Sequence, residues 1–232
     1  MAETIEALKR EAAEAAVGAL KSGMVVGLGT GSTAHYAVLA VGRQLAEGKL
    51  QEIVAIPTSE ETAALARQLG IPLSSLDEHP VVDVAIDGAD EIDPQLNLIK
   101  GLGASLLREK IVESCARRLI IIADERKLVE RLGTRAPVPV EVIPFAKRPA
   151  FDFLQTLGCR PVLRQEEGKT RITDEGNILL DCYFEKIEDA YHLAEAIKGQ
   201  PGVVEHGLFL GMASEAYVAL PGGVRHLEKK GG

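Results

Sequence analysis

Two patterns of hydrophobic and polar residues alternate along the first half of the chain. Short apolar runs rich in β-branched residues predict buried strands at 24–28, 52–56, 82–86 and 119–123. Between them, apolar residues at helical spacing predict helices at about 4–22, 34–48, 58–70 and 104–118. This alternation predicts an α/β fold, a doubly wound and mostly parallel Rossmann-like sheet with right-handed crossovers.

The pattern changes after residue 127, where prolines interrupt the chain. Helices are expected at 147–157 and 187–198, with strands at 138–143, 161–164, 171–173, 178–184 and 203–210. The order β-α-β-β-α-β is typical of a small ferredoxin-like α+β domain. We therefore expect a Rossmann-like domain of residues 1–128 plus 206–232, and an inserted domain of residues 129–205. The strand at 215–220 should return to the main sheet, and the Gly/Lys tail should fray.

Length and composition indicate a globular protein of 232 residues with 46% hydrophobic content. The formal net charge of -8 argues against a general nucleic-acid binder. No apolar run approaches the length of a membrane span, and the first 16 residues contain acids and no apolar signal region. We expect a cytoplasmic protein that binds neither nucleic acid nor membrane.

Cysteine and histidine usage gives no sign of a metal centre. The three cysteines are widely separated and form no C-x-x-C pair, so buried free thiols are expected. None of the five histidines sits among the clustered acids, which weakens a Ser-His-Asp or His-metal mechanism. Aromatic residues are only 4% and Trp is absent, so ligand contacts should be polar rather than stacked.

A glycine turn joins the strand at 24–28 to the next helix. In the sequence GLGTGSTA, glycines allow close backbone approach, and the hydroxyls of Thr30, Ser32 and Thr33 with free amides at a helix start suit a phosphate. The spacing is neither a P-loop nor a full G-x-G-x-x-G motif. A tight strand-to-helix turn with a Ser/Thr cap explains the pattern equally well.

Acidic residues cluster where the strand at 82–86 ends. Asp87 and Asp90 could converge on one pocket, where repulsion would raise the pKa of one carboxyl and suit it to proton transfer. The alternative is an acidic surface loop whose aspartates satisfy turn amides. Glu91 and Asp93 fit that alternative better.

Four further charged residues have two interpretations each. Lys100 precedes a glycine turn and could stabilise an oxyanion, or it is simply solvated. Helical spacing puts Glu109 off the apolar stripe formed by Leu107, Ile111 and Cys115, as for a surface glutamate. Lys9 in the first helix is best explained as a solvated charge, and Lys127 after a strand end is ambiguous.

Five motifs in this order closely resemble ribose-5-phosphate isomerases of the A type. They are GLGTGSTA, DGADEID, KGLGASLLREK, ADERK and PVPVEVIP, and the resemblance covers nearly the whole chain. It implies interconversion of ribose 5-phosphate and ribulose 5-phosphate without a metal or an organic cofactor. We also expect a homodimer or a homotetramer.

The resemblance implies a set of site residues. Glu109 matches the family's proton acceptor, Lys100 with Asp90 would serve O1 and O2 of the substrate, and Asp87 would assist ring opening. Leu102 stands where glycine is common, which a backbone contact would survive. The positions that match substrate-binding residues are Lys9, Thr30, Gly31, Ser32, Thr33, Asp87, Gly88, Ala89, Asp90, Lys100, Gly101, Leu102, Gly103 and Lys127.

Two other function classes share such a fold. One is an enzyme of a related kind, a sugar-phosphate deaminase that would release ammonia, or an acyl-group transferase. The other is a non-catalytic sugar-phosphate sensor, which would need an attached DNA-binding segment that we do not expect here.

Overall fold

The structure is a computed structural model that describes residues 4–229 of the chain. The chain divides into two compact units. Unit 1 comprises Met1–Ala89, Arg108–Lys127 and Met212–Gly232, and unit 2 comprises Asp90–Leu107 and Leu128–Gly211. The segment 129–205, which the sequence marks as an insertion, lies within unit 2, and this unit also contains residues 90–107.

A six-stranded sheet forms the centre of unit 1. Its order is β15-β14-β6-β3-β1-β2, and every pair is parallel except β14 with β15. The predicted doubly wound sheet and the return of residues 215–220 to it are confirmed. The strand β15 was not expected, and residues 230–232 of the tail predicted to fray lie outside the described residues. The strands are β1 (Val25–Leu28), β2 (Val54–Pro57), β3 (Val84–Gly88), β6 (Leu119–Asp124), β14 (Glu215–Leu220) and β15 (Gly223–Glu228).

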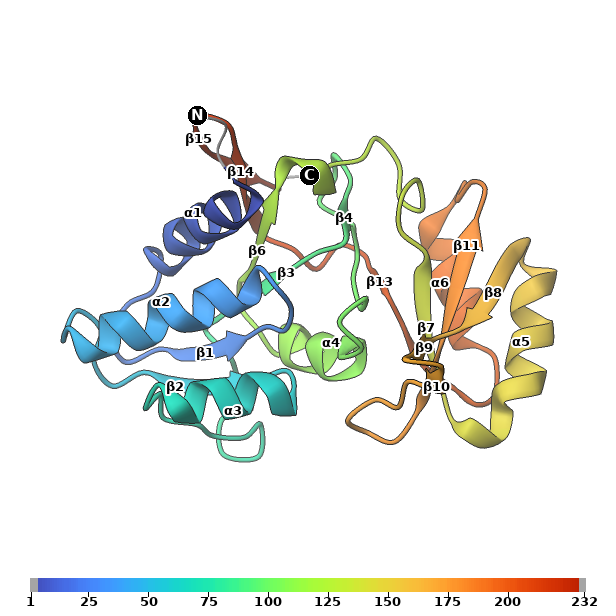
Figure 1. Ribbon diagram of the computed structural model, residues 1–232, viewed down its shortest axis with the longest axis horizontal. Coiled ribbons are helices and arrows are strands. Elements are labelled where there is room, and N and C mark those ends of the chain that lie inside the picture. Colours follow the sequence, from blue (N-terminus) through green and yellow to red (C-terminus); the bar gives the residue numbers. More distant parts are fainter. Residues whose placement is uncertain (1–3, 230–232) are drawn as a thin grey trace. The chain divides into compact units, whose positions relative to one another are not determined.

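Helices cover both faces of this sheet (Figure 1): α1, α2 and α3 share one core, whereas α4 packs on the other face, where Val112 faces Gly27 of β1. Alternation along the strands explains this, since Val26 and Leu28 join a core that includes apolar residues of α1 and α2. Small residues such as Ala12 and Ala16 are fully buried on α1 and allow close packing. The helices are α1 (Ile5–Val17), α2 (Ala34–Ala46), α3 (Glu60–Gln68) and α4 (Leu106–Ser114), with a 3-10 turn η1 (Glu125–Lys127) after β6.

Unit 2 contains a four-stranded antiparallel sheet in the order β12-β7-β11-β8. With two intervening helices this is the predicted ferredoxin-like arrangement. Val138, Val140 and Val142 point to one face of the sheet, where they form a core with residues of both helices. The elements are β7 (Val138–Val142), η2 (Pro144–Ala146), α5 (Lys147–Thr156), β8 (Cys159–Leu163), β11 (Ile178–Phe184), α6 (Ala190–Lys198) and β12 (Val203–His206).

The strand expected at 171–173 is wrong in position. A short hairpin of β9 (Gln165–Glu166) and β10 (Lys169–Thr170) precedes it, and Ile172 makes only an isolated bridge to Ile178. Gly168 at the hairpin tip has φ +77°, a conformation that glycine adopts readily. The turn at Gly168 therefore determined which residues pair as a hairpin, and the β-branched residues at 171–173 did not form the expected strand.

A small three-stranded sheet in unit 2 was not expected from the sequence. It has the order β13-β5-β4, with β4 (Glu91–Ile92), β5 (Leu98–Ile99) and β13 (Leu208–Phe209), and strands of two residues are too short to give a periodic pattern. The expectation that Glu91 lies in a surface loop is wrong. Its fully buried carboxylate accepts N–H groups of Gly133 at 2.6 Å, Ala136 at 2.7 Å and Arg135.

Asp93 does behave as a turn residue. One of its carboxylate oxygens accepts the N–H groups of Gln95 at 2.9 Å and Asn97 at 2.8 Å. The acidic segment therefore splits, because Glu91 reaches into a buried loop while Asp93 closes its own turn.

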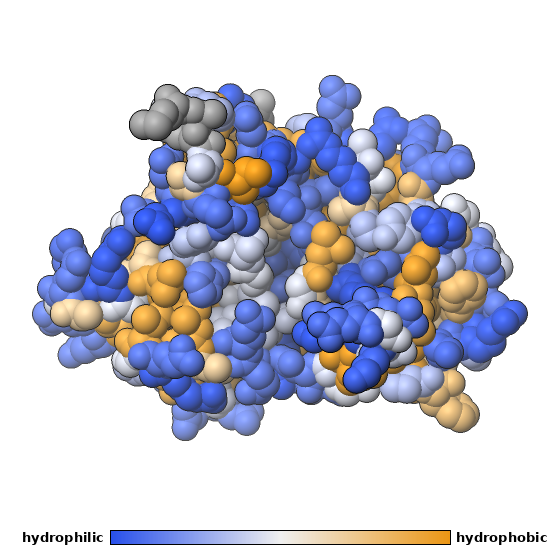
Figure 2. Space-filling model, viewed as in Figure 1, coloured by the Kyte–Doolittle hydropathy of each residue, from blue (hydrophilic) through white to orange (hydrophobic). Residues whose placement is uncertain are grey.

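Hydrophilic residues predominate on the face seen in Figure 2, and the apolar residues there are gathered in small separate areas. All three cysteines are free thiols; Cys159 and Cys182 are buried, as expected, while Cys115 is only half-buried. Within residues 4–229, no helix combines the length and the apolar character that a membrane crossing requires.

Candidate active site

The strand order of unit 1 points to one end of its sheet. From β1 the chain goes outward to β2 and then returns across β1 to β3, so the connections reverse direction between β1 and β3. In open α/β sheets, ligands bind at the carboxyl ends of the strands that flank such a switch point. The loop of residues 29–33 follows β1, and Asp87 and Gly88 end β3.

Asp87 and the glycine loop are built around one another. Gly29 donates its N–H to Ile86 O at 3.0 Å, and a Cβ atom on Gly29 would come within 2.1 Å of the Asp87 carboxyl. Asp87 Oδ1 accepts the N–H groups of Thr30 at 3.1 Å and Gly88 at 2.6 Å. These bonds fix the carboxylate, which is 1% exposed, at the switch point.

The Thr30 hydroxyl belongs to a buried network that the sequence did not reveal. Its Oγ1 lies 2.7 Å from Thr58 Oγ1, 2.8 Å from Ser59 Oγ and 3.1 Å from Thr62 Oγ1. Thr62 in turn donates to Gly29 O at 2.9 Å. Thr30 therefore shapes the loop by tying it to the start of α3, where Ser59 is the helix cap.

The remainder of the loop leads into the N-terminus of α2. Gly31 has φ +116° and is exposed, as is Ser32. Thr33 occupies the cap position of α2, yet its side chain makes no cap hydrogen bond. This end of α2 is therefore not closed by its own cap, and the helix dipole favours an anion there.

Glu109 lies on the buried face of α4. It is 2% exposed, and Glu113 one turn later is 3% exposed, so the prediction of a surface glutamate is wrong. Between them Val112 packs against β1, where Gly27 leaves the space: a Cβ there would lie 2.9 Å from Val112 Cγ1. The predicted apolar stripe is wrong as well, because Ile111 is 45% exposed. Its members are Leu107, Ile111 and Cys115.

Lys9 is held by an ion pair on α1 rather than solvated. Its side chain is only 14% exposed, and Nζ lies 2.8 Å from Glu6 Oε1. The hydroxyl of Tyr36 donates to the other oxygen of Glu6 at 2.6 Å. The hydrogen bond from Lys9, followed by that from Tyr36, lowers the pKa of Glu6.

Lys127 ends the 3-10 turn that follows β6. The preceding Asp124 is buried, and its carboxylate accepts hydrogen bonds from the Arg126 side chain at 2.6 and 3.0 Å. Burial raises the pKa of Asp124, but the hydrogen bonds from Arg126 outweigh burial and the net pKa is lowered. The ion pair fixes the turn from which Lys127 extends.

In unit 2, Lys100 is 2% exposed, so the solvated-lysine interpretation is wrong. Its backbone N–H donates to Gly207 O at 2.9 Å, and its Nζ lies 5.3 Å from the centre of the Phe209 ring. A cation over an aromatic face is stabilised by the ring quadrupole.

Asp90 and the turn after Lys100 lie together in unit 2. Asp90 donates its N–H to Ile99 O at 2.8 Å, and its Oδ2 accepts the N–H of Leu102 at 3.0 Å. The Leu102 side chain is 45% exposed, so the backbone of this residue makes the contact. Gly103 is exposed beside it.

The site residues therefore form two sets. Unit 1 supplies the carboxylates of Asp87 and Glu109, the open helix N-terminus at residues 29–33, and the cations of Lys9 and Lys127. In unit 2, Asp90, Lys100 and residues 101–103 supply a carboxylate, a buried ammonium and backbone N–H groups. These are the groups that proton transfer at a phosphorylated carbonyl compound requires. Among residues 4–229, no group of three or more His, Cys, Asp or Glu side chains is arranged to hold a metal ion.

Comparison with known proteins gives a consistent match. Residues 54–223 match the family model of Ribose 5-phosphate isomerase A (phosphoriboisomerase A). The Ribose-5-phosphate isomerase A of Roseiflexus castenholzii is 55% identical over 221 residues, which cover 95% of this chain and 94% of that protein.

Solved structures agree. The ribose 5-phosphate isomerase A of Methanocaldococcus jannaschii superimposes with a TM-score of 0.93 at 43% identity, covering 97% of this chain and 100% of that chain. A D-ribose-5-phosphate isomerase in complex with phospho-erythronic acid superimposes with a TM-score of 0.95 at 42% identity and the same two coverages.

Proposed function

The chain belongs to the ribose-5-phosphate isomerase A family, and from this premise we propose that it interconverts D-ribose 5-phosphate and D-ribulose 5-phosphate by general-base catalysis. The reaction moves one proton between C2 and C1 and passes through an enediolate. It needs a base, groups that stabilise the oxygens and an anchor for the phosphate.

Glu109 is the proposed base. Its place in the motif KGLGASLLREK, which matches the family's proton acceptor, carries this assignment, and its burial on α4 supports it, because a buried carboxylate is shielded from bulk water. Lys100 and Asp90 act on O1 and O2, where the lysine charge stabilises the enediolate. Asp87 assists opening of the furanose ring.

The phosphate is proposed to bind at residues 30–33. The open N-terminus of α2 supports this, since backbone N–H groups and the helix dipole favour an anion. Within the loop, Thr30 sets the shape, and the exposed Gly31 and Ser32 with Thr33 make the contacts. Lys9 and Lys127 add positive charge in a protein of net charge -8.

Replacing Glu109 by Gln tests the mechanism. Loss of a positioned general base costs roughly 10²- to 10⁴-fold in rate, so kcat should fall by that factor while KM changes little. Glu113→Gln is the matched control, because this glutamate is equally buried one turn later on the same helix. It should retain kcat to within a few-fold.

Isotope exchange gives a second measurement of the same step. The wild-type protein should introduce solvent deuterium at C1 or C2, and the Glu109→Gln variant should do so far more slowly. If Glu109→Gln retained the wild-type kcat while Asp87→Asn or Asp90→Asn abolished exchange, the base would lie in the segment 87–90 instead.

The deaminase alternative predicts a different product. A deaminase would release ammonia from an amino-sugar phosphate, whereas the proposed isomerase converts ribose 5-phosphate and continues to do so in a chelator. Ammonia release from an amino-sugar phosphate and conversion of ribose 5-phosphate can be assayed on one preparation. Only the conversion of ribose 5-phosphate should be observed.

A further inference from the structure

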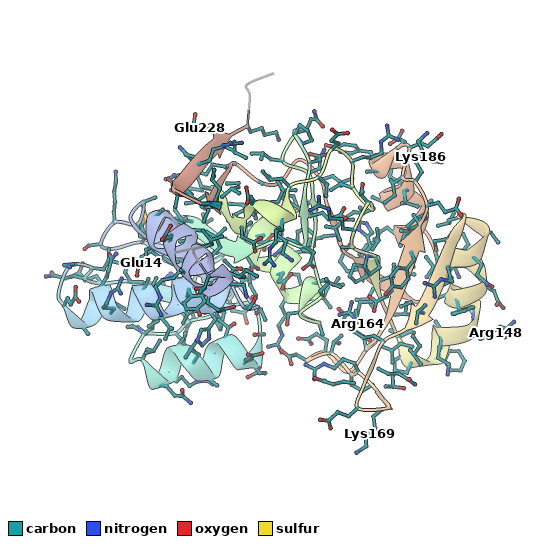
Figure 3. All side chains as sticks on the ribbon, turned by 45° about the horizontal axis from the view of Figure 1, so that its top comes forward. Glu14, Arg148, Arg164, Lys169, Lys186 and Glu228 are labelled. Atoms are coloured by element: carbon teal, nitrogen blue, oxygen red, sulfur yellow. The ribbon has the colours of Figure 1, made fainter. Side chains whose placement is uncertain are left out.

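Arg164, which follows β8, is held by a mostly buried ion pair in unit 2. Its Nε donates to Asp181 Oδ2 at 2.9 Å and its Nη2 donates to Asp181 Oδ1, a two-pronged contact in which the side chains are only 13% and 12% exposed. In Figure 3 Arg164 lies within unit 2, whereas Lys169 projects outward from the β9–β10 hairpin. A buried ion pair is weak evidence for stability, which raises the question of what it holds in place.

The remaining nitrogen of the guanidinium holds the turn after Lys100. Nη1 donates to Gly101 O at 2.8 Å and to Leu102 O at 3.1 Å. This turn has an unusual backbone, because Gly101 has φ +104° and Ala104 has φ +65°. A residue with a Cβ atom rarely adopts positive φ, so the turn requires support from its surroundings.

The geometry of the peptide group carries the effect of Arg164 to Asp90. A trans peptide is planar, and its C=O and N–H point in opposite directions. The Gly101 carbonyl faces Arg164, so the N–H of Leu102 in the same peptide plane points the other way, where it donates to Asp90 Oδ2 at 3.0 Å.

We propose that Arg164 is a positioning residue that aims the Asp90 carboxylate through the peptide between Gly101 and Leu102. Asp181 orients the guanidinium, the guanidinium orients the peptide, and the peptide N–H orients Asp90. This gives the ferredoxin-like sheet a part in the reaction, and it rests on the proposed function because Asp90 acts on substrate oxygens there.

Kinetics of Arg164→Ala and Arg164→Lys test the proposal. Misplacement of a reacting group by about 1 Å can cost around 100-fold, so we expect kcat to fall by about 10- to 100-fold with a smaller change in KM. The lysine variant should fail too, because an ammonium cannot reproduce the planar fork. Arg160→Ala is the control: Arg160 projects from the same face of β8, stacks on Tyr183 at 4.7 Å and should retain wild-type kcat.

Chemical rescue separates positioning from a general loss of structure. Ethylguanidinium supplies the groups that Arg164→Ala lacks and should restore part of kcat, whereas ethylammonium should not. If neither variant of Arg164 lowers kcat, or if both additives restore it equally, the proposal is overturned.

Arg164→Ala leaves the charge of Asp181 buried without its partner, which can unfold the protein, so a second variant is needed. Arg164→Met with Asp181→Leu removes both charges at similar volume. This folded variant should show the same fall in kcat, and wild-type kcat in it would refute the proposal.

Amide exchange of Leu102, followed by NMR, makes the result independent of turnover. The Leu102 N–H should exchange faster with solvent in Arg164→Ala than in the wild type and in Arg160→Ala. If wild-type protein fails to convert ribose 5-phosphate, the proposed function fails while Leu102 exchange still decides the role of Arg164. Unchanged exchange would overturn that role even in an active isomerase.

Discussion

Gly29 has no room for a side chain, because the Asp87 carboxyl occupies the space where a Cβ would lie. Gly29→Ala should force Asp87 or the loop to move and destabilise the protein by about 1–3 kcal/mol, as overpacking usually does. Since the displaced groups belong to the proposed site, kcat/KM should fall as well. Denaturant melts and steady-state kinetics measure both effects.

Gly199→Ala is the control for that substitution. Gly199 has φ -69°, and its added Cβ would lie 3.4 Å from the nearest atom, an ordinary contact. Its stability should be unchanged or slightly raised. Equal destabilisation by both substitutions would contradict the steric explanation.

At the same scale, the sequence offered candidate site residues through their motifs but misjudged the environment of two of them. Pattern analysis treats a charged residue off the apolar stripe as exposed, yet Glu109 and Lys100 are each 2% exposed. Arg164 gave no signal, because a lone arginine at a strand end usually faces solvent. Burial of charge depends on partners distant in sequence, which a local pattern does not contain.

Among the elements, β14 is tied to its neighbours by Glu215. Its carboxylate accepts a hydrogen bond from Arg118, which precedes β6, at 2.5 Å and contacts His226 of β15 at 2.7 Å. Burial raises the pKa of Glu215, but the bonds from Arg118 and His226 outweigh it, and the net pKa is lowered. Because the pKa is lower in the folded protein, the ionised carboxylate stabilises the fold at pH values above the unfolded pKa of about 4.3. This stabilisation is lost as the pH falls through the folded-state pKa.

Glu215→Gln should therefore lower the free energy of unfolding at neutral pH, and the difference from wild type should shrink below about pH 4. Glu228→Gln on the adjacent strand is the control, since its side chain is 75% exposed. Denaturant melts at several pH values measure the difference. A gap between wild type and Glu215→Gln that stayed constant to pH 3 would rule out this explanation.

Strands and helices of ordinary length were predictable, whereas the short ones were not. The four alternating strand–helix repeats of the first half appear in the structure within a few residues of their predicted bounds. β4, β5 and β13 have two residues each, and β5 pairs not only with the nearby β4 but also with β13, which lies far along the chain. Such pairing has no local signature, and Glu91 was misread for the same reason.

For the whole molecule, the important feature is how the chain is shared between the units. It passes from one unit to the other after residues 89, 107, 127 and 211. The last segment supplies β14, which pairs with the edge of β6 that β3 leaves uncovered. Doubly wound sheets are recognisable from local alternation, but this completion by the C-terminal segment depends on the topology.

A chain that ends at residue 211 should therefore fail to fold properly. It leaves the β6 edge open and removes Ala219 from the core of unit 1, and open edges promote aggregation. Size-exclusion chromatography and binding of a hydrophobic dye should show aggregates or a loosened core. A chain ending at residue 229 retains both β14 and β15, so it should stay largely monodisperse or form its normal assembly; equal behaviour of the two chains would contradict this.

The same arrangement causes a delay between the synthesis of β6 and that of β14 on the ribosome. β6 ends at Asp124 and β14 begins at Glu215, so at about 5–20 residues per second β14 is made roughly 5–18 s after β6. During that interval the nascent chain carries an apolar sheet with an unpaired edge, while residues 128–211 emerge and can begin to fold. Slow translation or scarce chaperones should therefore lower the yield of this protein more than that of a protein whose paired strands are synthesised in quick succession.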